Sequence, residues 1–188
     1  MEIESKFKVS SPDDIRSRLA RIGARLLSRE LEKDTYYAVP PGSRLTAIRL
    51  RASGDKGLFT IKTRPDEGFA RTPGVKALEE TEVEISDAGL FARMLRMLGF
   101  EPRFRKEKVR ESYVWRDVPI FLDELPFLGF HLEIEAPEDG IREAAAALGL
   151  DWAEASAETY LAIFTRYKNE RGLPDLELVF SEAPDYSG

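Results

Sequence analysis

The stretch EIESKFKV, residues 2–9, alternates charged and apolar side chains from its first position. Glu2, Glu4 and Lys6 share one parity, and Ile3 and Phe7 share the other. Successive side chains of an extended strand point to opposite faces, so this stretch predicts a strand with one apolar and one charged face. A single strand of this kind is typical of a solvated sheet. The same pattern returns in later strands, and its repetition bears on the whole fold.

Charged residues occupy one parity in most of the predicted strands. In chain order they are Glu2, Glu4, Lys6, Arg49, Arg51, Lys62, Arg64, Glu80, Glu82, Glu84, Lys106, Lys108, Arg110, Asp123, Glu133 and Glu135. The opposite, apolar parity can pack under helices. An open sheet would then leave the charged face in solvent, where salt bridges could form. A closed antiparallel β-barrel of about eight strands would enclose it instead. The charged parity alone leaves both arrangements open, and of the two we predict the barrel, an α+β fold with helices packed outside.

Three strand–helix units repeat along the chain. Their strands cover residues 2–9, 79–85 and 131–136, and their helices cover residues 11–24, 86–100 and 137–150. Ser10 or Ser11 is expected to cap the first helix and Ser86 the second, which Gly99 ends. Further strands are predicted at 31–39, 45–52, 57–64, 107–115 and 118–125, and a long mobile loop at 65–79. A helix over 156–172 packs through its aromatic residues, and 173–180 form an extended tail.

Length and composition exclude several classes of protein. The 188 residues suit one domain, residues 1–188, with a tail of about 172–188 that we leave unassigned. There is no cysteine and only one histidine, His131, so any metal must be a hard cation held by carboxylates. The net charge of −6 argues against nucleic-acid binding. No apolar run approaches the length of a membrane span, and no signal peptide is recognisable, so we expect a cytoplasmic protein without membrane contact.

A barrel interior lined by both signs of charge suggests a ligand. The lysines and arginines of this parity exceed what one phosphate group needs and suit a polyphosphate. Carboxylate pairs suit Mg²⁺ or Mn²⁺, which bridge protein carboxylates to phosphates. We also expect the basic side chains to face and repel one another when no ligand is bound.

An ordered set of motifs resembles the CYTH superfamily, the triphosphate tunnel metalloenzymes. EIESK (2–6) is similar to the superfamily's E-x-E-x-K signature. DTYY (34–37), IRLR (48–51), TIKT (60–63), EETEVEI (79–85), KVR (108–110) and LDELPFLGFHLEIE (122–135) resemble its later strands in the same order. The resemblance implies a triphosphate tunnel, and it extends from residue 1 to about 165.

Residue by residue, the resemblance implies two groups of ligands. Triphosphate would be held by Lys6, Arg49, Arg51, Lys62, Lys108 and Arg110, of which Lys6, Lys62, Lys108 and Arg110 would be catalytic. Metal would be held by Glu2, Glu4, Glu82, Glu84, Asp123, Glu133 and Glu135. Glu80 shares the parity of Glu82 and Glu84, and could replace one of them.

The resemblance implies an enzyme with a small-molecule triphosphate as substrate. The branch containing class IV adenylyl cyclases, which convert ATP to cyclic AMP and pyrophosphate, is the one that residues 122–135 resemble most. Hydrolysis of inorganic or thiamine triphosphate is the alternative, and non-catalytic polyphosphate or nucleotide binding is the second alternative. A homodimer is left open.

Overall fold

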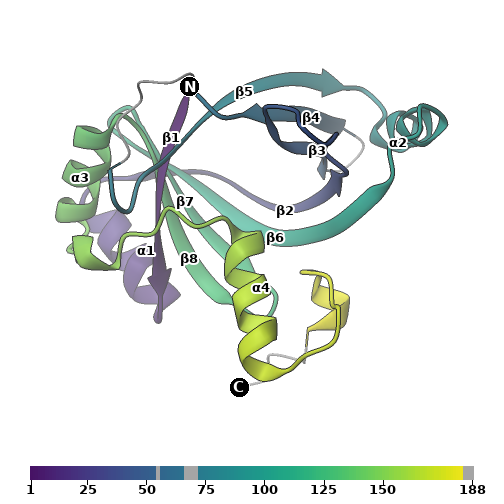
Figure 1. Ribbon diagram of the computed structural model, residues 1–188. Helices are drawn as coiled ribbons and strands as arrows, with labels where there is room; N and C mark the ends of the chain where they lie inside the picture. Colours follow the sequence, from purple (N-terminus) through teal and green to yellow (C-terminus); the bar gives the residue numbers. More distant parts are fainter. Residues whose placement is uncertain (54–55, 66–71, 184–188) are drawn as a thin grey trace.

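The computed structural model describes residues 1–53, 56–65 and 72–183, and Figure 1 shows the arrangement of its elements. In chain order these are β1 Glu2–Val9, α1 Pro12–Arg21, β2 Arg25–Tyr37, β3 Leu45–Ser53, β4 Lys56–Thr63, β5 Lys76–Ile85, α2 Ala88–Met97, β6 Pro102–Trp115, β7 Val118–Leu125, β8 Gly129–Glu135, α3 Glu138–Ala147, the 3-10 turn η1 Trp152–Glu154, α4 Tyr160–Arg171 and the 3-10 turn η2 Phe180–Glu182.

The eight strands close into a ring. Their order is β1-β5-β4-β3-β2-β6-β7-β8, and β8 pairs back with β1. Every neighbouring pair is antiparallel. The predicted α+β barrel is therefore confirmed, and alternation along each strand turns one set of side chains inward.

The ring is joined unevenly around β1. On one side, six residues of β1, Glu4 to Val9, pair with β8. On the other side only three residues, Glu2 to Glu4, pair with β5. Beyond that point Ser156 takes the place of β5. The Lys6 amide donates to the Ser156 carbonyl at 3.0 Å, and the Ser156 amide donates to the Lys6 carbonyl at 2.8 Å.

Three apolar clusters join the helices to the ring. The largest joins α1 and α3 to the outward faces of β1, β7 and β8, with Phe7, Ile120 and Leu132 at its centre. A second lies between α2 and strands β3 and β4 and includes Leu95. The third joins α4 to β7 and to the segment after α4, through Phe164. Figure 1 shows α1 and α3 on one side of the barrel and α2 on the other.

Helix ends follow the predicted chemistry with one correction. The Ser11 hydroxyl accepts from the Asp14 amide at 3.4 Å, as expected for a cap. The second helix is capped by Asp87 and not by Ser86, because the Asp87 carboxylate accepts from the Leu90 amide at 2.8 Å. Gly99 follows that helix with φ +85°, a left-handed conformation that glycine adopts without strain.

Several element boundaries differ from the sequence prediction. β2 and β6 begin earlier than expected and form a long ladder, which runs from Arg25 opposite Val114 to Tyr37 opposite Pro102. β5 begins at Lys76, inside the predicted loop 65–79, of which residues 66–71 lie outside the described part. The tail folds back, with a parallel bridge between Leu178 and Lys106. None of the described helices is long and apolar enough to cross a membrane.

Candidate active site

The inward side chains surround a cavity of about 1280 Å³. Most of the predicted site residues line it: Glu2, Glu4, Lys6, Arg49, Arg51, Lys62, Glu82, Lys108, Arg110, Glu133 and Glu135. Two predicted metal ligands do not. Asp123 is fully buried beneath Lys108, Arg110 and Tyr160, and Glu84 is exposed. The alternation read from the sequence therefore brings both signs of charge into one cavity.

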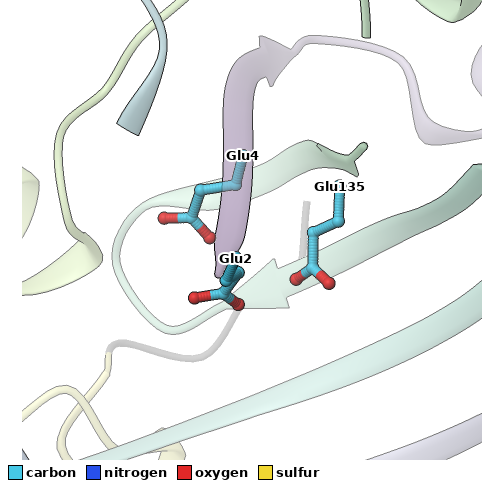
Figure 2. A group of neighbouring side chains, drawn as sticks. All are labelled: Glu2, Glu4 and Glu135. Atoms are coloured by element: carbon cyan, nitrogen blue, oxygen red, sulfur yellow. The ribbon is translucent and has the colours of Figure 1, made fainter. Parts of the chain in front are cut away.

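Three carboxylates gather where β1 meets β8. Glu2, Glu4 and Glu135 each offer an oxygen, and these oxygens lie within 4.8 Å of one another (Figure 2). Glu4 stands directly opposite Glu135 in the strand register, so the cluster follows from strand pairing. Oxygen ligands in this number suit a hard divalent cation. Glu133, one inward position further along β8, instead accepts from Arg110 and pairs with Lys6.

Among the described residues Glu135 is the carboxylate of this cluster without an ion pair, whereas Glu4 pairs with Lys6 and Lys76 and Glu2 pairs with Lys62. Burial, together with the charges of Glu133 and Glu2, raises the pKa of Glu135 to about 9. Burial and a hydrogen bond with Glu2 raise the pKa of Glu80 to about 7. Burial opposes ionisation of Glu2 as well, but its bond with Glu80 and the charge of Lys62 lower its pKa to about 2. The pKa of Glu80 is therefore raised and that of Glu2 lowered by their contact, and a bound cation would favour the ionised form of both.

Glu80 is the residue of β5 that reaches the acidic cluster. It bonds with Glu2 and pairs with Lys62. Glu82 lies at another level, where its Oε1 accepts from the Thr60 hydroxyl at 2.7 Å and from Arg49 at 3.3 Å. The structure does not bring Glu84 to the cavity. Glu80, Glu82 and Glu84 share one parity, so the alternation alone could not choose among them.

Eight of the basic groups that line the cavity are paired with carboxylates and do not face one another alone, which corrects the expected repulsion. The pairs are Lys6 with Glu4 and Glu133, Arg49 with Glu82, Arg51 with Glu32 and Asp34, Lys62 with Glu2 and Glu80, Lys76 with Glu4, Lys106 with Asp34, Lys108 with Glu32 and Asp123, and Arg110 with Asp123 and Glu133. Sequence reasoning left Glu32, Asp34, Lys76 and Lys106 out of the site. Asp34 lies in DTYY and Lys106 shares the charged parity, so both signals were available.

Asp123 is surrounded by donors from the protein itself. Its Oδ1 accepts from Arg110 Nε at 2.6 Å. Its Oδ2 accepts from Arg110 Nη2 at 2.6 Å, Lys108 Nζ at 3.0 Å and the Tyr160 hydroxyl at 2.9 Å. Burial opposes its ionisation, yet the charges of Arg110 and Lys108 lower its pKa to about 2. These contacts use the roughly four lone-pair sites of a carboxylate. The arrangement suits holding Lys108 and Arg110 in place more than binding metal.

Tyr160 is a site residue that sequence reasoning assigned to helix packing. Its ring lies within 5.2 Å of Lys6 Nζ, 5.5 Å of Lys106 Nζ and 5.7 Å of Lys108 Nζ. His131 meets the same ring edge-on, with 5.5 Å between ring centres. Burial, and then the charge of Lys8, lower the pKa of His131 to about 4, so this histidine is neutral at pH 7.

Comparison with known proteins agrees with this geometry. A family model described as the CYTH domain matches residues 1–159. The chain belongs to the CYTH domain family. MJ0240 of Methanocaldococcus jannaschii, named as a candidate adenylate cyclase, is 26% identical over 144 residues, which are 76% of this chain and 81% of that one.

Two solved structures show how the CYTH fold recurs. The Pyrococcus furiosus protein Pfu-838710-001 has 26% identity and a TM-score of 0.73, covering 86% of this chain and 99% of that one. HpAC1 from Hippeastrum, an adenylyl cyclase candidate described as having a dominant triphosphatase activity, has 20% identity and a TM-score of 0.61. That match covers 98% of this chain and all (100%) of the other, and at this identity it shows the fold alone. The relative named as a candidate adenylate cyclase supports an enzyme in general terms.

Proposed function

We propose that this CYTH protein is a metal-dependent enzyme that acts on a small-molecule triphosphate, with ATP as the first candidate. One observation carries the proposal. A carboxylate cluster suited to a hard cation and a set of buried lysines and arginines line the same cavity of about 1280 Å³. Metal-bridged phosphates held by basic side chains need both groups at once.

The triphosphate would lie against the inward basic residues. In this proposal Lys6, Arg49, Arg51, Lys62, Lys108 and Arg110 hold its oxygens, and Lys6, Lys62, Lys108 and Arg110 also stabilise the charge that develops during reaction. These side chains now bond to carboxylates. Phosphate oxygens would replace part of those contacts, so ligand binding exchanges one set of charge-assisted hydrogen bonds for another.

Glu2, Glu4 and Glu135 would hold Mg²⁺ or Mn²⁺, with Glu80 beside them and Glu133 facing Lys6. When bound, the metal would neutralise phosphate oxygens and polarise the phosphorus under attack. The donor set fits such a cation, because it consists of carboxylate oxygens and because burial and the neighbouring carboxylates Glu133 and Glu2 raise the pKa of Glu135, a strain that a cation would relieve. Glu82, Glu84 and Asp123 have other surroundings, and we do not include them among the ligands.

The first candidate reaction is that of an adenylyl cyclase. The ribose 3′-oxygen would form a bond to the α-phosphorus while the bond from that phosphorus to the bridging oxygen breaks. Pyrophosphate would leave, and the hydroxyl proton would pass to solvent. The similarity to MJ0240, named as a candidate adenylate cyclase, supports this candidate.

The second candidate is a triphosphatase. A water oxygen would bond to phosphorus, the bridging bond would break, and the water's proton would go to the products. The raised pKa of Glu80, about 7, supports this candidate, because a carboxyl group with a pKa near neutrality can accept a proton from water and return it.

One set of incubations tests the proposal. ATP, tripolyphosphate and thiamine triphosphate are each given to the purified protein with Mg²⁺ or Mn²⁺, and with chelator as control. Cyclic AMP with pyrophosphate would identify the cyclase, and phosphate release the triphosphatase. Binding without turnover would leave a non-catalytic polyphosphate-binding protein, and neither binding nor turnover would overturn the proposal.

A further inference from the structure

The inward face of the barrel continues beyond the large cavity. Along β1 the inward residues are Glu2, Glu4 and Lys6, and the next one of that parity is Lys8. In the register with β8, Lys6 stands opposite Glu133 and Lys8 stands opposite His131. A second cavity of about 510 Å³ opens at this level, lined in part by Lys8, His131 and Arg166. Lys6 lines both cavities, so they are neighbouring parts of one interior.

Tyr160 lies between the two cavities. It lines the large one, and on its other side its ring meets His131 of the small one. Its neighbours come from β1, β6, β7 and β8, as Lys6, Lys106, Asp123 and His131 do. On α4, Leu161 lines the large cavity and Ile163 the small one, so the start of this helix crosses the interior.

The position of Tyr160 is fixed by its surroundings. It is 5% exposed, and its hydroxyl donates to Asp123 at 2.9 Å. Thr159 caps α4 by accepting from the Ala162 amide at 3.1 Å. One turn later Phe164, fully buried, packs on Phe127. A helix start held by a cap, a buried hydrogen bond and an apolar anchor has little freedom to move aside.

We propose that Tyr160 is a stop against which the free end of the phosphate chain rests, so that it decides which bond of the chain lies at the acidic cluster. The inference rests on the proposed function and deepens it. Lys6, Lys106 and Lys108 surround the ring and collect the negative charge of that free end. The acidic cluster lies at a fixed distance from the ring, because β1 carries Glu2, Glu4 and Lys6 on one strand. The bond that breaks therefore lies a fixed number of phosphates from the free end of the chain, whatever the length of the substrate.

The small cavity offers room for a chain that passed the stop, and its lining carries both signs of charge, with Glu154, Glu158 and Glu170 beside Lys8, Arg166 and Arg171. Lys8 is exposed and forms no ion pair with residues 1–53, 56–65 or 72–183. His131 is 4% exposed, and its Nδ1 has no hydrogen-bond partner among the described residues. Arg166, by contrast, is held by Glu158 at 2.5 Å. Removing the Tyr160 ring would join the cavities, and Lys8 would be the first free cation beyond it.

The test compares ATP with adenosine 5′-tetraphosphate, which have the same nucleoside and differ by one phosphate. Inorganic products at early times are separated by anion-exchange chromatography. If the free end fixes the position of the chain, the wild-type protein releases from the tetraphosphate an inorganic fragment no longer than the one it releases from ATP. Absence of reaction with the tetraphosphate is the other expected result. A fragment one phosphate longer, formed at a rate within twofold of the ATP reaction, would overturn the proposal, because the nucleoside would then set the position.

Two variants separate the ring from the hydroxyl. Tyr160→Ala is expected to release the longer fragment from the tetraphosphate at least tenfold faster than the wild type. Tyr160→Phe keeps the ring and is expected to keep the wild-type product, at a lower rate. Adding Lys8→Ala to Tyr160→Ala is expected to reduce the longer fragment severalfold. If Tyr160→Ala does not fold by circular dichroism, Tyr160→Leu replaces it.

The outcomes distinguish failure of the proposed function from failure of the stop alone. A wild-type protein that neither binds nor converts ATP or tripolyphosphate would overturn the proposed function, and the stop with it. A wild-type protein that converts ATP, with Tyr160→Ala or Tyr160→Leu active and giving wild-type products, would overturn the stop alone. Release of the longer fragment by Tyr160→Phe would also overturn it, because the hydroxyl and not the ring would then be responsible.

Discussion

Arg110 is the side chain whose removal most directly tests the buried ion-pair network. Its guanidinium donates twice to Asp123 at 2.6 Å and once to Glu133 at 2.8 Å. Arg110 is 8% exposed and Asp123 is 0% exposed, so solvent cannot replace these bonds. Removing one partner of a buried pair costs about 3–5 kcal/mol, because the other charge stays buried without compensation.

We therefore expect Arg110→Ala to lower the free energy of unfolding by about 3 kcal/mol, the lower end of that range, because Lys108 and Tyr160 still donate to Asp123. For a chain of this length that corresponds to a melting temperature lower by roughly 6–12 °C. The double variant Arg110→Met with Asp123→Leu should recover part of the loss, since neither charge then remains unpaired.

Urea unfolding of the ligand-free protein, without metal or phosphate, measures the effect. Arg105→Ala is the matched control, because Arg105 lies on the same strand and pairs with Glu177 but its side chain is 61% exposed. An exposed pair contributes about 0–1 kcal/mol. If Arg110→Ala cost no more than Arg105→Ala, or raised the stability, the network would not be holding the barrel interior. The hypothesis that the basic side chains repel one another in the ligand-free protein would then be supported instead.

Three further predictions follow from the cavity. The raised pKa of Glu135, about 9, means that the folded state holds a proton that the unfolded state loses above its ordinary pKa, so ligand-free stability should fall as pH rises from about 5 to 9. Glu135→Gln should flatten that slope in urea unfolding at pH 6 and 8.5, and an unchanged slope would contradict the burial argument. Mg²⁺ should bind more tightly as pH rises and release protons, which calorimetry in two buffers of different ionisation enthalpy detects; binding without proton release would mean that the cation binds elsewhere. Tripolyphosphate at a hundredfold its Kd should add about 2.7 kcal/mol to stability and raise the melting temperature by roughly 5–11 °C, whereas an unmoved transition would exclude tight binding to the native state.

The alternation of side chains was enough to predict the barrel and most of its interior. Parity decides the face of a strand, so Glu4, Lys6, Arg49 and Lys108 could be placed inside without any knowledge of their neighbours. Parity does not decide at which level along the barrel axis an inward side chain lies. Which of Glu80, Glu82 and Glu84 meets Glu2 depends on how β5 is placed against β1 and β4, and that placement is set by the whole ring.

Residues from outside the alternating strands were the harder part. Tyr160 belongs to a helix whose aromatic residues suggest packing, and Phe164 does pack as expected. The role of Tyr160 in the cavity depends on where α4 crosses the barrel, and no local sequence pattern encodes that position. The pairing of Asp34 with Arg51 and Lys106 was missed for a related reason, because β2 meets β3 on one side and β6 on the other.

The uneven closure of the ring at β1 gives the barrel a preferred line of local opening. Only three residues of β1 pair with β5, whereas the opposite edge of β1 pairs over six. At the short seam, Lys76 with Glu4 and Lys62 with Glu2 supplement the backbone bonds. Such pairs weaken with salt, which a long ladder resists better. Amide hydrogens of the β1–β5 seam should therefore exchange with deuterium before those of the β2–β6 ladder, and faster as ionic strength rises. The barrel would then open locally at the β1–β5 seam, beside its acidic cluster, while the β2–β6 ladder on the opposite side stays paired.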